Sequence, residues 1–252
     1  MRLYTAGWKS VSLVDVVEHP TFTLWLCGCN LQCPFCHNWR IAERDSKLCR
    51  WIEVDTILEE VEASKFLVDY LHVTGGEPLI QYTSVKELFE KTRRIGLATS
   101  LNSNLTTPLH YLKHIVEPGL VDHVATDFKI PSGFLYGLPE KASMVLWRNF
   151  VESLKYLGSK GVELELRIPV YKELAPSILE KYLDEIISYL NPDKTTVVFN
   201  PLIGEPFTNP RDPAWCRKHC IVDSEQVKTL ADVFNEKGFN KIIVKSISGF
   251  TR

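Results

Sequence analysis

The chain has 252 residues, 45% of them hydrophobic, and a formal net charge of −2. This composition is enough for one large core, and the small net charge gives no indication of a generally basic surface for nucleic acids. No run approaches the ~18 apolar residues of a membrane span, and the N-terminus lacks the apolar segment of a signal peptide. With an odd number of cysteines, seven, we predict a cytoplasmic protein of a reducing, anaerobic cell, without a disulfide framework and without membrane or general nucleic-acid partners.

Apolar, β-rich runs alternate along the chain with segments of helical period. A polar N-cap at Ser224 and a stop at Gly238 delimit the last of these helices. The pattern predicts strands at 21–26, 70–73, 97–101, 123–127, 162–170 and 195–201, and helices at 54–65, 84–95, 109–115, 142–157, 178–190 and 224–237.

This alternation predicts an α/β fold in which a parallel sheet carries an outer layer of helices. Periodicity alone does not distinguish an open doubly wound sheet from a barrel. We expect one domain over residues 1–252, with an N-terminal extension at 1–20 and an irregular, proline-rich loop at 202–223. The remaining part, 224–252, is expected to hold the C-terminal helix and an edge strand at 241–247.

Three cysteines, Cys29, Cys33 and Cys36, follow the first predicted strand at C-x3-C-x2-C spacing. Clustered cysteines inside cells are more often metal ligands than disulfides. Three soft thiolates on one short loop can hold three irons of a [4Fe–4S] cube and leave the fourth iron open to a second molecule. The cysteines alone therefore favour a catalytic iron–sulfur site, with a zinc site or a disulfide as the alternatives.

The other four cysteines carry weaker signals. We expect Cys27 to pack in the core and Cys49 to be isolated. Cys216 and Cys220 are spaced i,i+4, which would bring them together on a helix. We favour two buried thiols at these positions over an auxiliary metal site that includes His219.

Polar or glycine residues also stand at the carboxyl ends of the later predicted strands, the edge that carries active sites in parallel α/β folds. Residues with a purely structural role would not need to stand at the same end of all these strands. In chain order the residues are Gly75, Gly76, Glu77, Asn102, Ser103, Asn104, Asp127, Lys129, Arg167 and Asn200.

The cysteine segment resembles a known family. The three cysteines, with Phe35 before the last of them, are similar to the signature of radical S-adenosylmethionine (radical SAM) enzymes. Residues 12–15 and 28–38 resemble the N-terminus of glycyl-radical-enzyme activating proteins, chiefly the short anaerobic ribonucleoside-triphosphate reductase activating protein and pyruvate formate-lyase activating enzyme. Residues 74–78 and 126–129 resemble later motifs of the superfamily.

The resemblance implies an incomplete (β/α)6 TIM-like barrel, a [4Fe–4S] cluster on the three cysteines, and S-adenosylmethionine as the second cofactor. An electron from the cluster would cleave the sulfonium to a 5′-deoxyadenosyl radical. That radical would abstract hydrogen from a glycine of a partner glycyl radical enzyme. A flavodoxin or a ferredoxin would supply the electron.

The resemblance also suggests roles for individual residues. Gly75 and Gly76 would let the backbone approach the methionyl amine. Phe35 and His37 would flank the adenine. Glu77 would balance the ammonium charge or cap the next helix.

The later strand ends suggest further contacts. Asp127 and Lys129, two apart on one strand face, would pair with each other or face cofactor and substrate. Arg167 would clamp a carboxylate or form a surface ion pair.

Two positions depart from the family pattern. Family members commonly have Asp-Tyr-Pro-Gly where this chain reads Asp-Val-Val-Glu-His-Pro at 15–20. Asn102, Ser103 and Asn104 offer polar groups to the ribose or carboxylate, but an acidic residue often stands in place of Asn102. A monovalent cation site is therefore left open.

Two other functions remain open. One is a radical SAM enzyme that acts on a small molecule or a modified base, as in a deazapurine-synthase-like ring contraction, for which the segment 202–221 could serve. The other is a non-catalytic iron–sulfur or zinc protein.

Overall fold

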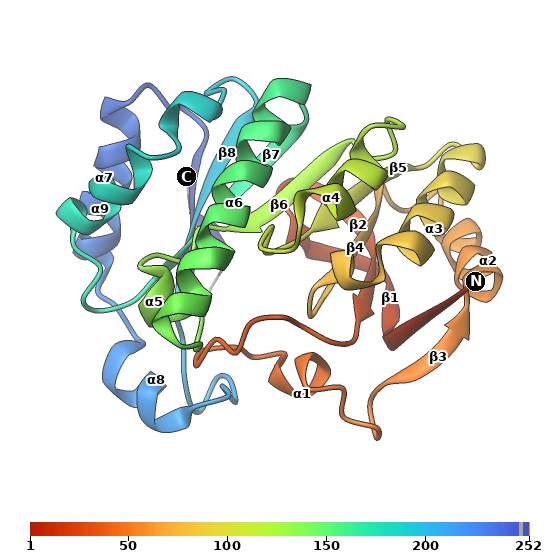
Figure 1. Cartoon of the computed structure of the whole chain (residues 1–252), viewed down its shortest axis with the longest axis horizontal. Helices are drawn as coiled ribbons and strands as arrows, with labels where there is room; N and C mark the ends of the chain where they lie inside the picture. Colours follow the sequence, from red (N-terminus) through yellow and green to blue (C-terminus); the bar gives the residue numbers. More distant parts are fainter. Residues whose placement is uncertain (247–248, 252) are drawn as a thin grey trace. The chain divides into compact units, whose positions relative to one another are not determined.

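The computed structural model describes residues 1–246 and 249–251, and the chain divides into two compact units (Figure 1). Unit 1 comprises Met1–Asn30 and Asn38–Ala125, and unit 2 comprises Leu31–His37 and the chain from Thr126 onward. Within the described residues, no helix is both long and apolar enough to cross a lipid bilayer. The single domain expected over residues 1–252 stays a prediction.

Unit 1 is built on a mostly parallel sheet. Its strands are β1 (Arg2–Val16), β2 (His19–Leu26), β3 (Arg50–Glu53), β4 (Tyr70–Gly75), β5 (Ala98–Asn102) and β6 (His123–Asp127), whose last two residues belong to unit 2. The strand order is β3-β1-β2-β4-β5-β6. The pairings of β1 with β2 and β3 are antiparallel, and those of β2 with β4, β4 with β5, and β5 with β6 are parallel.

Helices cover this sheet and connect its parallel strands. They are α1 (Trp39–Ala42), α2 (Val54–Ser64), the 3₁₀ turn η1 (Pro78–Gln81), α3 (Tyr82–Arg94) and α4 (Leu109–Val116). Figure 1 shows α2, α3 and α4 side by side, which is the arrangement expected when successive βα units lie in register.

Unit 2 continues the alternation of strands and helices. Its elements are α5 (Ser132–Leu135), α6 (Glu140–Lys160), β7 (Glu163–Val170), α7 (Pro176–Leu183), the 3₁₀ turn η2 (Ile187–Tyr189), β8 (Thr195–Pro201), α8 (Pro213–His219), α9 (Ser224–Glu236), β9 (Ile242–Ser246) and β10 (Gly249–Thr251). The pairings of β7 with β8 and of β8 with β9 are parallel, and β10 pairs antiparallel with β9.

Each unit has its own apolar core. Most positions of β2 and β7 are buried, although β7 alternates its apolar residues with the charged Glu165 and Arg167. Fully buried side chains include Phe22, Leu24, Leu71 and Val73 in unit 1, and Leu166, Ile168, Phe199 and Phe234 in unit 2.

The structure confirms all six predicted strands, with the bounds of 123–127 and 195–201 unchanged. Five of the six predicted helices are confirmed as single helices. The helix expected over 178–190 is wrong in its second half, because α7 ends at Leu183 and Ile186 has φ −123°, outside the helical region. Asp223, rather than Ser224, caps α9: its side chain accepts hydrogen bonds from the backbone N–H groups of Glu225 and Gln226.

Three other expectations need correction. The N-terminal extension 1–20 is wrong, because it forms β1 and the start of β2, joined by a turn in which Glu18 has φ +65°. The loop 202–223 contains α8. A strand at 241–247 is confirmed as β9, although β10 pairs with it, so it is not an edge; residue 247 lies outside the described residues.

Candidate functional site

Four of the seven cysteines form two disulfides, and three remain as thiols. The bridges are Cys27–Cys49 and Cys216–Cys220, and the free thiols are Cys29, Cys33 and Cys36. The prediction of no disulfides was wrong, because an odd total can be divided into three ligands and two pairs. Cys49 is not isolated, and the expected pair of buried thiols at 216 and 220 is a bridge.

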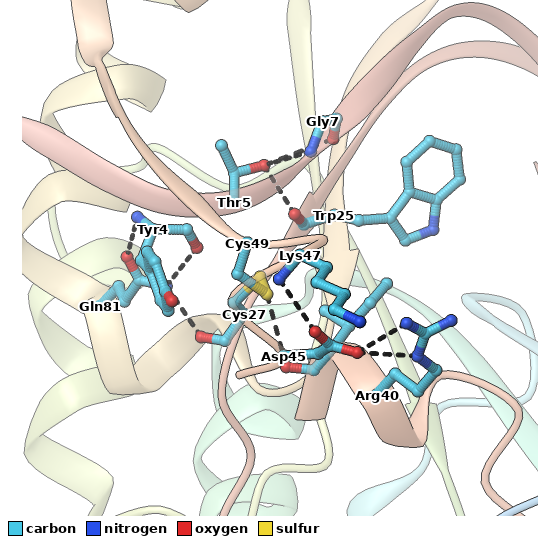
Figure 2. Close-up of a disulfide and its surroundings, with 11 residues drawn as sticks. Tyr4, Thr5, Gly7, Trp25, Cys27, Arg40, Asp45, Lys47, Cys49 and Gln81 are labelled. Carbon is cyan, nitrogen blue, oxygen red and sulfur yellow. Dashed lines mark hydrogen bonds and ion pairs between the residues drawn. A yellow bond between two sulfur atoms is a disulfide. The ribbon is translucent and has the colours of Figure 1, made fainter. Parts of the chain in front are cut away.

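The first disulfide lies at the corner where β2 ends (Figure 2). The backbone N–H of Cys27 donates to the carbonyl of Tyr4 at 2.8 Å, and the Gln81 amide donates to the carbonyl of Cys27 at 3.2 Å. Gln81 also accepts a hydrogen bond from the N–H of Tyr4 at 2.8 Å. The sequence separation of 22 residues between Cys27 and Cys49 encloses all three free cysteines.

The length of this enclosed segment predicts a substantial stabilisation. Closing a loop of about 22 residues in the unfolded chain is worth about 3 kcal/mol, against about 2 kcal/mol for the short Cys216–Cys220 loop. In urea unfolding of the cluster-free protein, we therefore expect Cys49→Ser to cost more free energy of unfolding than Cys220→Ser. A thiol reductant should abolish the difference between the parent and Cys49→Ser. An unfolding midpoint of the parent that does not change when the reductant is added would contradict this expectation.

Two glycines at the end of β4, Gly75 and Gly76, lie directly against the corner that precedes Cys29. The N–H of Gly76 donates to Leu26 at 2.8 Å, and the N–H of Glu77 donates to the carbonyl of Gly28 at 2.8 Å. A Cβ atom on Gly76 would overlap the carbonyl oxygen of Gly28, and Gly75 has φ +113°. The close approach therefore requires glycine at both positions.

The Glu77 carboxylate is fully buried and organises the next strand end. It accepts hydrogen bonds from the N–H of Leu79 at 2.9 Å, the hydroxyl of Ser103 at 2.8 Å and the N–H of Asn104 at 2.7 Å. The first of these contacts caps η1, one of the two roles predicted for Glu77. The other two fix the turn that follows β5.

The predicted polar triplet at that turn is directed to different partners. Asn102 donates to the hydroxyl of Thr74 at 2.9 Å. Asn104 donates to Asn30 at 2.8 Å and to the sulfur of Cys29 at 3.7 Å. The structure therefore places Cys29, Glu77 and the 102–104 turn together in unit 1.

In unit 2, backbone hydrogen bonds hold the segment that carries Cys33 and Cys36. The N–H of Cys36 donates to the carbonyl of Cys33 at 3.2 Å, and the N–H of Gln32 donates to Tyr136 at 2.9 Å. From the 202–223 segment, Arg211 donates its N–H to the carbonyl of Cys36 at 3.1 Å, and Asp212 similarly donates to Pro34 at 2.9 Å. The segment expected to be an irregular loop thus supports the cysteine loop.

The two residues predicted to flank the adenine contact the same segment. The rings of Phe35 and Trp215 are tilted, with centroids 6.1 Å apart. Burial lowers the pKa of His37 below its ordinary value, against the opposing effect of a backbone hydrogen bond with Ile203. Burial also raises the pKa of Tyr136, so its hydroxyl stays protonated.

The charged residues after β6 and on β7 form two ion pairs in unit 2. Nζ of Lys129 lies 2.7 Å from Oδ2 of Asp127, and Nε of Arg167 lies 2.6 Å from Oε1 of the buried Glu165. Burial opposes ionisation of Asp127, but the charges of Lys129 and Arg167 outweigh it and hold the pKa of Asp127 below its ordinary value. In the same unit, the side-chain Oδ1 of Asn200 is buried and has no hydrogen-bond partner among the described residues.

Two expectations about these charges were wrong. Asp127 and Lys129 do not alternate on one strand face, because β6 ends at Asp127 and the N–H of Lys129 turns back to the carbonyl of Asp127 at 3.0 Å. The ion pair of Arg167 is not on the surface, since its partner Glu165 is only 1% exposed.

Sequence reasoning missed a buried polar row across unit 1. The row joins β2, β4, β5 and β6 in register through Thr23, His72, Ser100 and His123. Ser100 Oγ lies 2.8 Å from Nδ1 of His72 and 2.7 Å from Nδ1 of His123. The available signal was the polar residues at alternate positions of β4 and β5, namely His72 and Thr74, and Ser100 and Asn102.

The donor set fits a [4Fe–4S] cluster. Within the described residues, no three His, Cys, Asp or Glu side chains could hold a single metal ion together. A cube binds each cysteine through a different iron, so its thiolates need not converge on one point. The three thiols that remain free when the other four cysteines pair are soft ligands of the required number.

Comparison with known proteins identifies the sequence family. The radical SAM superfamily model matches residues 24–186, more than half of the chain. A Methanocaldococcus jannaschii protein provisionally named as a glycyl-radical enzyme activating enzyme is 24% identical over 73% of this chain and 72% of its own length. The 7-carboxy-7-deazaguanine synthase of Methanospirillum hungatei is 32% identical over 45% of this chain and 44% of its own. The pyruvate formate-lyase-activating enzyme of Staphylococcus aureus is 32% identical over 38% and 40%.

Solved structures show the fold. A radical SAM methyltransferase from Sphaerobacter thermophilus matches with a TM-score of 0.59 at 14% identity, over 91% of this chain and 67% of its own. Coproporphyrinogen III oxidase of Escherichia coli, a radical SAM enzyme, matches with a TM-score of 0.57 at 15% identity, over 95% and 62%. These likenesses confirm the predicted α/β fold of the incomplete-barrel type.

Proposed function

Because this chain belongs to the radical SAM superfamily, we propose that it activates a partner protein by abstracting a hydrogen atom from one of that protein's glycines. The superfamily uses a [4Fe–4S] cluster and S-adenosylmethionine. Of this chain's residues, Cys29, Cys33 and Cys36 would bind the cluster. When bound, the reduced cluster would supply one electron, and S-adenosylmethionine would supply the 5′-deoxyadenosyl group that takes the hydrogen atom.

The chain's own residues would bind and orient the second cofactor. Gly75 and Gly76 expose backbone at the strand end and would receive the methionyl amine. Phe35 supplies an aromatic face, and the imidazole ring of His37 supplies a second one. These two rings would flank the adenine.

The polar residues at the later strand ends would complete the cofactor and substrate contacts. Asn102 would reach the ribose or the carboxylate, while Ser103 and Asn104 would act chiefly by holding the turn, since their side chains already bond to Glu77, Asn30 and Cys29. Their direct contact with the cofactor stays a prediction.

The charged group of unit 2 would face the substrate. Asp127 is held ionised by Lys129 and Arg167, so it can accept hydrogen bonds at neutral pH. The guanidinium of Arg167 would serve a carboxylate or a main-chain carbonyl. The buried Oδ1 of Asn200 is a hydrogen-bond acceptor without a donor among the described residues, so a donor of the substrate such as a peptide N–H would suit it.

The similarity to the M. jannaschii protein carries the choice of a glycine substrate, because it extends over most of both chains. The likeness to pyruvate formate-lyase-activating enzyme supports the same choice over a shorter stretch. The partner would be a glycyl radical enzyme, and a flavodoxin or ferredoxin would donate the electron. Such an oxygen-sensitive cluster would operate in an anaerobic cytoplasm.

A small-molecule substrate is the second candidate. The observation that favours it is the 32% identity to 7-carboxy-7-deazaguanine synthase, although that match covers less than half of either chain. The two candidates share the cofactor chemistry and differ only in the source of the abstracted hydrogen.

Isotope transfer tests the proposal. The anaerobically reconstituted protein is mixed with S-adenosylmethionine, a reductant, and a candidate glycyl radical enzyme that carries glycine deuterated at Cα. We expect 5′-deoxyadenosine that is one deuterium heavier and a glycyl radical signal in electron paramagnetic resonance spectra. The matched control is the Cys36→Ala variant, which should give neither product.

The outcomes separate the candidates. Unlabelled 5′-deoxyadenosine without a glycyl radical, rising on addition of a deazapurine precursor, would favour the small-molecule reaction. The absence of any 5′-deoxyadenosine from protein with a full cluster would contradict both.

A further inference from the structure

The side-chain amide of Asn104 makes four hydrogen bonds within unit 1. Its oxygen accepts from the N–H of Thr106 at 2.9 Å and from the hydroxyl of Thr106 at 2.7 Å. Its nitrogen donates to Oδ1 of Asn30 at 2.8 Å and to the sulfur of Cys29 at 3.7 Å. Both amide hydrogens and both oxygen lone pairs therefore have partners.

This network determines which way the amide of Asn104 points. The backbone N–H of Thr106 can only donate, so the atom that faces it must be the amide oxygen. The amide nitrogen then faces Cys29 and Asn30. Asn30 reinforces this orientation, because its own amide donates to the hydroxyl of Thr106 at 2.7 Å and thereby closes the ring of hydrogen bonds.

The backbone of Asn104 is held as firmly as its side chain. The Glu77 carboxylate accepts from the N–H of Asn104, and the hydroxyl of Ser103 accepts from the N–H of Leu105 at 3.0 Å. Leu105 has φ +55°, a conformation that a leucine adopts only when its surroundings impose it. Asn104 is only 8% exposed, so water cannot readily replace its contacts.

We propose that Asn104 is a positioning and tuning residue for the cluster, which donates an N–H···S hydrogen bond to the Cys29 thiolate and thereby raises the reduction potential of the cluster. This inference rests on the cluster ligands assigned in the proposed function. A hydrogen bond withdraws negative charge from the thiolate and stabilises the reduced cluster, which carries one more electron. Glu77 acts through Asn104, because its buried carboxylate fixes the turn from which the amide donates.

The test is the midpoint potential of the cluster, measured without S-adenosylmethionine by a redox titration that is followed by electron paramagnetic resonance. Asn104→Leu removes the donor without adding charge, and we expect a shift to more negative potential. The equilibrium constant for cluster reduction should fall about fivefold, the value of one hydrogen bond.

The matched control is Asn235→Leu, the same substitution on α9. Asn235 is exposed and donates to Asp232 on its own helix at 3.5 Å, so the potential should equal that of the parent. Iron content near four per chain in each variant shows that the cluster is intact. An Asn104→Leu potential equal to that of the parent, or a shift of equal size in Asn235→Leu, would overturn the inference.

A measurement on the unmodified protein covers the case in which Asn104→Leu fails to fold. Protein labelled with ¹⁵N-asparagine, with its cluster reduced, should show a ¹⁵N hyperfine coupling in pulsed electron paramagnetic resonance. The absence of this coupling would overturn the inference. A parent that binds no cluster at all would instead contradict the proposed function.

Discussion

Cys36→Ala is expected to lower the rate of 5′-deoxyadenosine formation by at least about 100-fold, because even substitutions behind a metal ligand cost 10–100-fold. The variant removes one of three thiolates that the other four cysteines cannot replace while they are bridged. Its fold should survive, since the substitution leaves the hydrogen bonds that the backbone atoms of Cys36 make with Cys33 and Arg211 in unit 2.

The measurement combines iron content with product formation under dithionite. The control is the double variant Cys216→Ser, Cys220→Ser, which removes two cysteines without removing a ligand and should keep about four irons per chain. A full cluster and normal cleavage in Cys36→Ala would show that the ligand assignment is wrong. An iron content near eight in the parent that halves in the double variant would instead reveal a second cluster, which the bridge between Cys216 and Cys220 does not favour.

The ligands could be recognised from the sequence because they are close together in it, whereas their supporting contacts could not. Asn104 and Cys29 are 75 residues apart, and nothing in either segment shows that the amide and the sulfur meet. The same holds for Glu77, whose partner Asn104 lies 27 residues away. The sequence predicted a turn in each of these segments. Which residues of the turns meet depends on the register of β2, β4 and β5.

The disulfides illustrate a second limit. The total of seven cysteines argued against bridges, and the separation of Cys27 from Cys49 gave no sign that they pair. Their approach follows from β1, which places Tyr4 beside Cys27, and from the way β3 returns to β1 immediately after Cys49. β1 itself was missed because its turn to β2 contains Glu18 at positive φ, where a glycine or asparagine would have been the usual signal.

The strands and most helices were predictable because their cores are encoded locally. Apolar residues at alternate or successive positions define β2, β4 and β7, and strong amphipathic periods define α3 and α9. The 202–223 segment lacked such a period. Its helix α8 is short and begins at a proline after the capping Asp212, so its support of the cysteine loop became visible only in the structure.

Gly76→Ala is expected to lower both iron content and S-adenosylmethionine binding, although it adds only one methyl group. The new Cβ atom would overlap the carbonyl oxygen of Gly28, which is backbone and cannot rotate away. That carbonyl accepts the hydrogen bond from the N–H of Glu77, and Cys29 is the next residue. Relief of the overlap, at a cost of about 2 kcal/mol, must therefore move the first cluster ligand as well as the turn assigned to the methionyl amine.

This coupling between Gly76 and Cys29 gives the prediction its distinctive result, since a glycine that served only the cofactor amine would leave the iron content unchanged. We expect iron content to fall below half of the parent value and the S-adenosylmethionine dissociation constant to rise about tenfold or more, in line with the same ~2 kcal/mol of strain. The matched control is Gly133→Ala, where a Cβ atom meets nothing within 4 Å and φ is not positive. Full iron and an unchanged dissociation constant in Gly76→Ala would contradict the role of this close approach, because the overlap with Gly28 would then be relieved without moving Cys29.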